Sequence, residues 1–209
     1  RSATAIWAEE FATALAQPSL NLQGLILAGG TGRRLGQGPK HAVQLGSCTM
    51  LEHVERALRP QVSGWQLNAP RDAATVTHPC RVLEDPPDFA GQGPLAGILA
   101  GLQTASSRYL LCVPVDAVRL PPDLAQRLLL AVQIRQQPLA LAGDHYTCLL
   151  MDRDHTADLA TQLLAYLRSG QRSIRGWLQQ LPLCRVDWPD EGWIWSLNTP
   201  RELAAAHAS

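Results

Sequence analysis

Short apolar runs alternate with longer amphipathic patterns over most of the 209-residue chain. The apolar runs, which end at Gly, Pro, Asn or Asp, predict strands at 24–28, 65–69, 81–85, 108–116, 139–143, 146–152, 184–188 and 193–198. The amphipathic patterns predict helices at 49–59, 93–105, 121–132, 155–170, 173–181 and 199–208. Strand–helix alternation of this kind predicts an α/β fold, with a mostly parallel central sheet and helices on both of its faces.

Local signals support the helix boundaries. Thr49 and Glu52 have the spacing of a capping box, and Thr199 and Glu202 repeat that spacing with Pro200 at the first helical position. The chain length suits one α/β domain, which we expect over residues 23–209. Residues 1–22 are interpreted as an N-terminal extension without an assigned role. Acidic residues interrupt its apolar pattern, which is therefore not that of a signal peptide.

The amino-acid composition narrows the classes of partner that the protein is expected to bind. The 18 basic and 18 acidic residues cancel to a formal net charge of zero. Without a basic field, neither nucleic acid nor an anionic membrane is an expected partner. The five cysteines are scattered singly, with no zinc-type spacing, which favours reduced thiols and a cytoplasmic location.

Glycines and cations are concentrated directly after the first predicted strand. This stretch contains Gly29, Gly30, Gly32, Arg33, Arg34, Gly36, Gly38 and Lys40. Glycine-rich backbone can turn N–H groups toward an anion, and the cations add the charge that a polyphosphate needs. The stretch matches neither the mononucleotide P-loop nor the dinucleotide fingerprint, because it lacks Gly-Lys-Ser/Thr and has Leu35 where a glycine is required. The alternative is a surface loop with solvated cations.

Lys40 is the one lysine among the 18 basic residues of the chain. An ammonium is a compact point charge that can lie between phosphate oxygens, whereas the planar guanidinium of arginine needs a different geometry. We interpret Lys40 as a phosphate-binding residue, with chance retention as the alternative.

Five stretches resemble, in order, the molybdenum cofactor guanylyltransferase family. They are "LILAGGTGRRLG…PK", "LNAPR" (67–71), "VLEDPPDFAGQGPLAG" (82–97), "LLCVPVDAVRLPPDLAQRL" (110–128) and "SLNTPRELA" (196–204). The resemblance runs from about Gln23 to the C-terminus. It implies a Rossmann-like nucleotidyltransferase fold and the Mg²⁺-dependent transfer of GMP from GTP to the terminal phosphate of molybdopterin, with release of pyrophosphate. Contact with molybdoenzyme maturation proteins is a further expectation.

The resemblance also implies roles for individual residues. Asp116 would hold Mg²⁺, and Lys40 and Arg33 would stabilise the charge that develops on the phosphates. The nucleotide would contact Leu27, Ala28, Gly29, Gly30, Lys40, Asn68, Asp85 and Asp116, with Asn198 at the border of the same cleft.

Residue chemistry by itself leaves alternatives. Asp116 could instead cap the helix predicted at 121–132, and Asp85 and Asn68 could serve a loop rather than a ribose or a base. The N-terminus of the helix that begins near Pro94 could face an anion or simply start the helix.

Some positions depart from the family pattern. Pro39 stands where an aspartate is usual, Ala117 and Val118 replace Thr-Pro, and Tyr146 replaces a proline. These changes bear on acceptor fit and on rate. They keep two other readings open: a cytidylyl- or sugar-phosphate nucleotidyltransferase on the same fold, and a non-catalytic nucleotide-binding partner in molybdoenzyme maturation.

Overall fold

The computed structural model describes residues 21–29, 39–70, 80–154 and 158–188, together with Leu197 and Glu202. The predicted strand at 193–198 and helix at 199–208 lie outside the described residues, apart from Leu197 and Glu202. The proposed N-terminal extension, residues 30–38 of the glycine loop and Asn198 also lie outside them.

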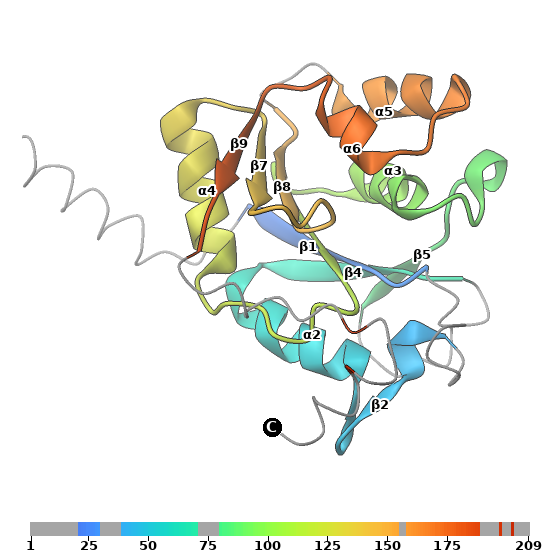
Figure 1. The fold of residues 1–209 in the computed structure, drawn as a ribbon, viewed down its shortest axis with the longest axis vertical. Helices are drawn as coiled ribbons and strands as arrows, with labels where there is room; N and C mark the ends of the chain where they lie inside the picture. Colours follow the sequence, from blue (N-terminus) through green and yellow to red (C-terminus); the bar gives the residue numbers. More distant parts are fainter. Residues whose placement is uncertain are drawn as a thin grey trace, which may run out of the picture.

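A seven-stranded sheet forms the centre of the described structure, in the order β5-β4-β1-β6-β8-β7-β9 (Figure 1). Its strands are β1 (Leu22–Leu27), β4 (Gly64–Asn68), β5 (Arg81–Leu83), β6 (Tyr109–Pro114), β7 (Leu139–Ala142), β8 (Leu149–Asp152) and β9 (Leu183–Val186). Neighbouring strands are parallel except at β8, which runs antiparallel to both β6 and β7. The predicted mostly parallel α/β sheet is therefore confirmed.

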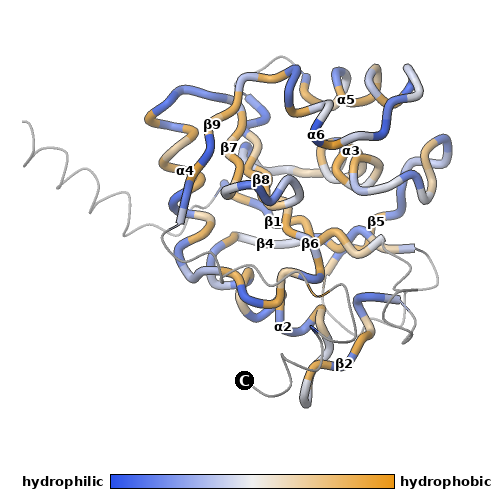
Figure 2. Tube along the Cα trace, in the orientation of Figure 1, coloured by the Kyte–Doolittle hydropathy of each residue, from blue (hydrophilic) through white to orange (hydrophobic). Residues whose placement is uncertain are grey.

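Helices cover both faces of this sheet, as predicted. They are α2 (Met50–Leu58), α3 (Pro94–Thr104), α4 (Leu124–Arg135), α5 (Leu159–Arg168) and α6 (Ile174–Leu178). One buried cluster joins the sheet to α2 and α4, and a second joins its other face to α3, α5 and α6. Figure 2 shows hydrophobic residues along the central strands and hydrophilic ones on the outer turns of the helices. None of the helices in the described ranges is both long and apolar enough to cross a membrane.

The predicted boundaries hold best where local chemistry sets them. Thr49 and Glu52 form the expected capping box, in which the Thr49 hydroxyl accepts from the Glu52 N–H and the Thr49 N–H donates to Glu52 Oε2. α3 has Pro94 at its first turn, as predicted. β6 spans Tyr109–Pro114 and is therefore shorter than the strand predicted at 108–116. β5 ends at Leu83 rather than at residue 85.

The two buried cysteines behave as small hydrophobic residues. All five are free thiols, and Cys112 and Cys148 are fully buried. Burial raises the pKa of the Cys148 thiol to about 12, and it raises the pKa of Cys112 as well. Both thiols therefore stay protonated in the folded protein and take no part in nucleophilic chemistry.

The strand order reverses beside β1, and this reversal determines where a ligand can bind. From β1 the chain runs through α2 to β4, which lies on one side of β1 in the sheet, whereas from β6 it runs through α4 to β7, which lies on the other side. The chain therefore leaves the carboxyl ends of β1 and β6 in opposite directions. In open α/β sheets this reversal leaves a crevice at the strand ends, where ligands bind.

Candidate functional site

A cavity of about 280 Å³ opens at the carboxyl ends of β1 and β6. Leu27 and Pro114, the last residues of these strands, are register partners, and the Val115 N–H donates to the Leu27 carbonyl over 3.0 Å. The lining consists of Leu27, Gly29, Lys40, Asn68, Asp85, Gly91, Gly93, Pro94, Pro114, Val115, Asp116 and Thr147. The cavity therefore lies at the crevice that the strand order predicts.

Lys40 and Asp116 meet across this cavity, although 76 residues separate them in sequence. Lys40 begins the short 3₁₀ helix η2 (Lys40–Ala42), and Asp116 lies two residues beyond the end of β6. The Lys40 Nζ donates to Asp116 Oδ2 over 2.8 Å. The side chains are 20% and 12% exposed, so solvent screens this pair only in part. The pair places a cation and a carboxylate side by side at the end of the longest predicted strand.

Asp116 is not a helix cap. The N-cap of α4 is Asp123, and the backbone carbonyl of Asp116 accepts from the Leu197 N–H at 3.2 Å. The alternative that assigned Asp116 to the start of this helix is therefore wrong. The carboxylate instead belongs to the cavity wall, where a metal ion could approach it.

The described residues contain no group of three or more His, Cys, Asp or Glu side chains that could hold a metal ion. Asp116 would thus contribute one carboxylate oxygen ligand, which suits a hard cation such as Mg²⁺. Phosphate oxygens and waters would complete the coordination, as is usual for Mg²⁺ at nucleotide sites. The donor chemistry fits the expected metal.

Asn68 and Asp85 form one hydrogen-bonded unit on the other side of the cavity. The Asn68 Nδ2 donates to Asp85 Oδ1 at 3.0 Å and to the Leu83 carbonyl at 3.4 Å. The Gly91 N–H donates to Asp85 Oδ2 at 3.0 Å. These bonds fix the orientation of the carboxylate, because both of its oxygens accept from a defined donor.

The absence of a side chain at Gly97 makes room for Asn68. Asn68 is 3% exposed and lies against the first turn of α3. A Cβ on Gly97 would overlap the Asn68 Oδ1 and would lie 2.6 Å from its Cγ. Glycine at this position therefore lets a buried amide stand between β4 and α3.

The start of α3 also borders the cavity. Gly93 has φ +99° and Pro94 occupies the first turn, and both residues line the cavity. No acidic side chain lies in the first turn of this helix. Its N-terminal N–H groups and the helix dipole would favour an anion there.

The structure brings most of the predicted site residues together. Leu27, Gly29, Lys40, Asn68, Asp85 and Asp116 all line the one cavity. Ala28 is buried beside them, and its N–H donates to the Asn68 carbonyl at 2.8 Å. Gly30, Arg33 and Asn198 lie outside the described residues.

Four lining residues were not singled out in the sequence: Gly91, Pro114, Val115 and Thr147. Gly91 would have been suggested only by its position between the end of β5 and the start of α3. Thr147 lies in the turn between β7 and β8, and Val115 follows β6. Short-range patterns carry no signal for Thr147, because its nearness to the cavity depends on the pairing of β8 with β6.

The departures at Ala117 and Val118 do not change the cavity wall. Ala117 is 0% exposed and Val118 is 8% exposed, and both belong to the core on the α2 and α4 side of the sheet. Tyr146 packs at the edge of the other core cluster, with the Arg185 guanidinium 5.9 Å from its ring centroid. The first two substitutions are therefore packing changes rather than changes in the groups that face a ligand.

Comparison with known proteins identifies the family. A family model described as the MobA-like NTP transferase domain matches residues 24–184. This chain belongs to the MobA-like NTP transferase family. A molybdenum cofactor guanylyltransferase of Burkholderia ambifaria is 33% identical, covering 91% of this chain and 97% of the relative. One of Cupriavidus taiwanensis is 36% identical, covering 90% and 97%.

Solved structures show the same fold. Molybdopterin-guanine dinucleotide biosynthesis protein A from Archaeoglobus fulgidus superposes with a TM-score of 0.74 at 19% identity, covering 89% of this chain and 97% of that one. A 2-C-methyl-D-erythritol 4-phosphate cytidylyltransferase from Thermus thermophilus gives a TM-score of 0.67, also at 19% identity, over 89% and 97% of the two chains. The MobA-like fold and its nucleotidyltransferase architecture therefore extend over most of the chain.

Proposed function

We propose that this protein transfers GMP from GTP to the terminal phosphate of molybdopterin, with release of pyrophosphate, in a Mg²⁺-dependent reaction. The observation that carries the proposal is the Lys40–Asp116 pair at the cavity between β1 and β6. It occurs in a chain whose relatives, 33% and 36% identical over nearly their full length, are named molybdenum cofactor guanylyltransferases. A cation, an oxygen ligand and helix N–H groups around one cavity are the groups that bind a nucleoside triphosphate and a metal.

The triphosphate would lie along the mouth of the cavity. The N-terminus of α3 would supply N–H groups there, and Lys40 would supply a compact positive charge. The Lys40 ammonium donates to Asp116. We expect its ammonium to turn toward the phosphate oxygens when the triphosphate arrives, because these oxygens carry more negative charge than one carboxylate.

Asp116 would hold Mg²⁺ together with the phosphates. When bound, the metal supplies Lewis-acid neutralisation of phosphate charge. The contribution of the chain is the placement of one carboxylate at the end of β6, beside Lys40 and opposite Asp85.

The acceptor would attack directly. An oxygen of the molybdopterin phosphate forms a bond to the α-phosphorus of GTP, and the bond from that phosphorus to the bridging oxygen of pyrophosphate breaks. The attacking oxygen is already anionic, so the reaction needs no strong general base. Catalysis then consists of positioning the two phosphates and stabilising the leaving charge, in which Lys40 and, by resemblance, Arg33 take part.

The nucleoside would face Asn68 and Asp85. Their hydrogen bonds to each other and to Gly91 hold a carboxylate ready to accept from ribose hydroxyls or from the N1–H and N2–H₂ edge of guanine. The rigid orientation of this pair would favour one nucleotide over another.

The proposal is tested by pyrophosphate release from purified protein with molybdopterin and Mg²⁺, comparing GTP, CTP and ATP. We expect release with GTP, its loss on chelation of the metal, and its recovery on adding Mg²⁺ back. Selective release with CTP would replace the guanine assignment with a cytidylyltransferase. GTP binding without release from any nucleotide would instead support a non-catalytic maturation partner. Contact with maturation proteins and a cytoplasmic location stay predictions.

A further inference from the structure

The segment between β5 and α3 provides a large part of one cavity wall. Asp85, Gly91 and Gly93 come from it and line the cavity, together with Pro94, the first residue of α3. Gly91 and Gly93 have φ values of +68° and +99°, which L-residues with side chains rarely adopt. A glycine-containing segment of this kind has many accessible conformations, so its placement depends on contacts from outside.

Arg172 makes those contacts from the turn between α5 and α6. Its Nε donates to Oε1 of Gln92, which is 80 residues away in sequence. Its Nη1 donates to the carbonyls of Leu167 and Gln171, both at 2.7 Å. The guanidinium carbon lies 5.7 Å from the centroid of the Phe89 ring. Arg172 thus joins the C-terminal turn of α5 to two residues of the segment.

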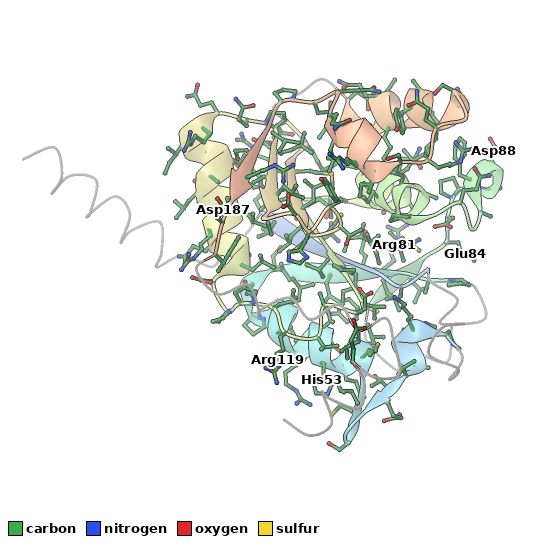
Figure 3. All side chains as sticks on the ribbon, viewed as in Figure 1. His53, Arg81, Glu84, Asp88, Arg119 and Asp187 are labelled. Carbon is green, nitrogen blue, oxygen red and sulfur yellow. The ribbon has the colours of Figure 1, made fainter. Side chains whose placement is uncertain are left out.

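Gln92 and Phe89 connect the Arg172 contacts to the rest of the segment. The Gln92 Nε2 donates to the Asp88 carbonyl at 3.0 Å, and the Gln92 N–H donates to the Phe89 carbonyl at 3.0 Å. Phe89 is 5% exposed and packs in the core cluster that contains α3. The 3₁₀ helix η5 (Pro87–Phe89) is therefore held by residues that do not line the cavity. Figure 3 marks Asp88 at the outer edge of this turn.

Gly91 connects this segment to the hydrogen-bonded pair of Asn68 and Asp85. Its N–H donates to Asp85 Oδ2, and Asp85 Oδ1 accepts from Asn68 Nδ2. A shift of the segment at Gln92 would move the adjacent Gly91 N–H and so release one oxygen of the Asp85 carboxylate. Arg172 itself is not a lining residue of the cavity. Its influence on a ligand would therefore be indirect.

The contacts are specific to arginine. The guanidinium uses its Nε edge for Gln92, its Nη1 for two carbonyls and its face for the Phe89 ring, all at once. A lysine ammonium has no planar face and no second edge, so it could keep the charge but not the geometry.

We propose that Arg172 is a positioning residue for the nucleotide: through Gln92 and Phe89 it fixes residues 85–93, which carry the Asp85 side of the cavity. The identity of the nucleotide in this inference rests on the proposed function, whereas the anchoring of the segment does not. Arg172 acts on binding and selectivity rather than on the chemical step, because it does not line the cavity, whereas Lys40 and Asp116 do.

The test compares Arg172→Gln with Arg175→Gln, which removes an exposed arginine from the neighbouring turn of α6. Dissociation constants for GTP and CTP are measured by calorimetry, and KM and kcat by pyrophosphate release. In Arg172→Gln we expect the GTP dissociation constant and KM to rise about tenfold, with a smaller change in kcat. The preference for GTP over CTP should shrink. Arg175→Gln should match the wild type.

Hydrogen exchange gives a readout that does not depend on activity. Amides of residues 88–92 should exchange faster in Arg172→Gln, and in Arg172→Lys to nearly the same extent, than in Arg175→Gln. Gln92→Ala removes the partner from the other side. Because both changes break the same contact, the double variant should raise the GTP dissociation constant less than the product of the single effects. Gln92→Ala also provides the test if Arg172→Gln fails to fold.

Several results would overturn the inference. One is a GTP dissociation constant in Arg172→Gln and Gln92→Ala equal to that of Arg175→Gln. Another is a lower melting temperature with unchanged binding, which would leave Arg172 a merely structural role. If the wild type binds GTP but releases no pyrophosphate, the proposed reaction fails while the dissociation constants still decide the role of Arg172. If the wild type binds no nucleotide, both proposals fail.

Discussion

Substitution of Gly97 by alanine tests whether the buried amide of Asn68 organises the nucleotide side of the cavity. The added Cβ would overlap Asn68 Oδ1, lie 2.6 Å from Asn68 Cγ and lie 3.0 Å from Leu27 Cδ2. Asn68 is 3% exposed and held by Asp85 and by the Leu83 carbonyl, so it cannot swing into solvent. The amide must shift, and its hydrogen bonds to these two partners must lengthen or break.

The loss in the free energy of unfolding caused by Gly97→Ala follows from these contacts. Loss of the two Asn68 hydrogen bonds removes about 1 kcal/mol each, and the steric overlap adds about 1–3 kcal/mol. Replacing glycine by alanine within a helix returns about 1 kcal/mol. The net loss in the free energy of unfolding is therefore about 2–4 kcal/mol. For a chain of this size, that corresponds to a fall in melting temperature of about 4–16 °C.

Gly97→Ala should also weaken GTP binding. Displacement of Asn68 frees one oxygen of Asp85 from its donor, so the GTP dissociation constant should rise about tenfold or more. Gly101→Ala is the matched control, because Gly101 lies one turn further along α3. Its Cβ would meet the terminal methyl groups of Leu25 and Leu110, which can move, and no part of Asn68. Both variants gain the same helix propensity.

The assays are thermal unfolding and calorimetric GTP binding on the two variants and the wild type. We expect Gly101→Ala to bind GTP like the wild type, whatever its stability. If Gly97→Ala also binds GTP like the wild type, Asn68 does not organise the site and the reasoning is refuted. Equal losses of affinity in both variants would point to a general disturbance of α3 rather than to Asn68.

Three further predictions follow from single residues. Lys40→Arg should fold normally but lose about a hundredfold in kcat, because a planar guanidinium cannot take the place of the ammonium between phosphate oxygens; wild-type turnover would contradict the role of Lys40. Thr49→Ala removes the capping box of α2 and should lower the free energy of unfolding by about 1 kcal/mol, measured by urea denaturation; an unchanged midpoint would be the opposing result. Burial raises the pKa of the Cys148 thiol from 9.0 to about 12, so the unfolded chain releases this proton at a lower pH than the folded chain. Stability should be intact below pH 9.0 and decline between pH 9.0 and about 12, and Cys148→Ala should weaken that decline in urea unfolding series.

The site could be predicted from the sequence wherever a functional residue follows a strand. Leu27, Asn68, Asp85 and Asp116 each lie at or just after the carboxyl end of a strand, where open α/β sheets bind ligands. Lys40 was found in another way, from its rarity and its glycine-rich surroundings. The structure places all five around one cavity, and their chemical roles remain predictions.

Partners within the site could not be predicted. That Lys40 meets Asp116, and that Asn68 meets Asp85, depends on which strands lie side by side. Arg172 is a stronger example, because nothing near it in sequence suggests a ligand. Its contact with Gln92 arises only because the turn between α5 and α6 packs against the segment before α3.

Local patterns in the sequence were enough to predict the α/β class, the capping box at Thr49 and the glycine-rich stretch that ends at Lys40, because hydrophobic period, capping and backbone freedom are local properties. Tertiary structure decided the strand order, the antiparallel course of β8 and the side of the sheet that each helix covers. It also decided that Ala117 and Val118 face the core and that Gly97 leaves room for Asn68. These features depend on contacts between residues far apart in the chain, which form only when buried side chains pack together.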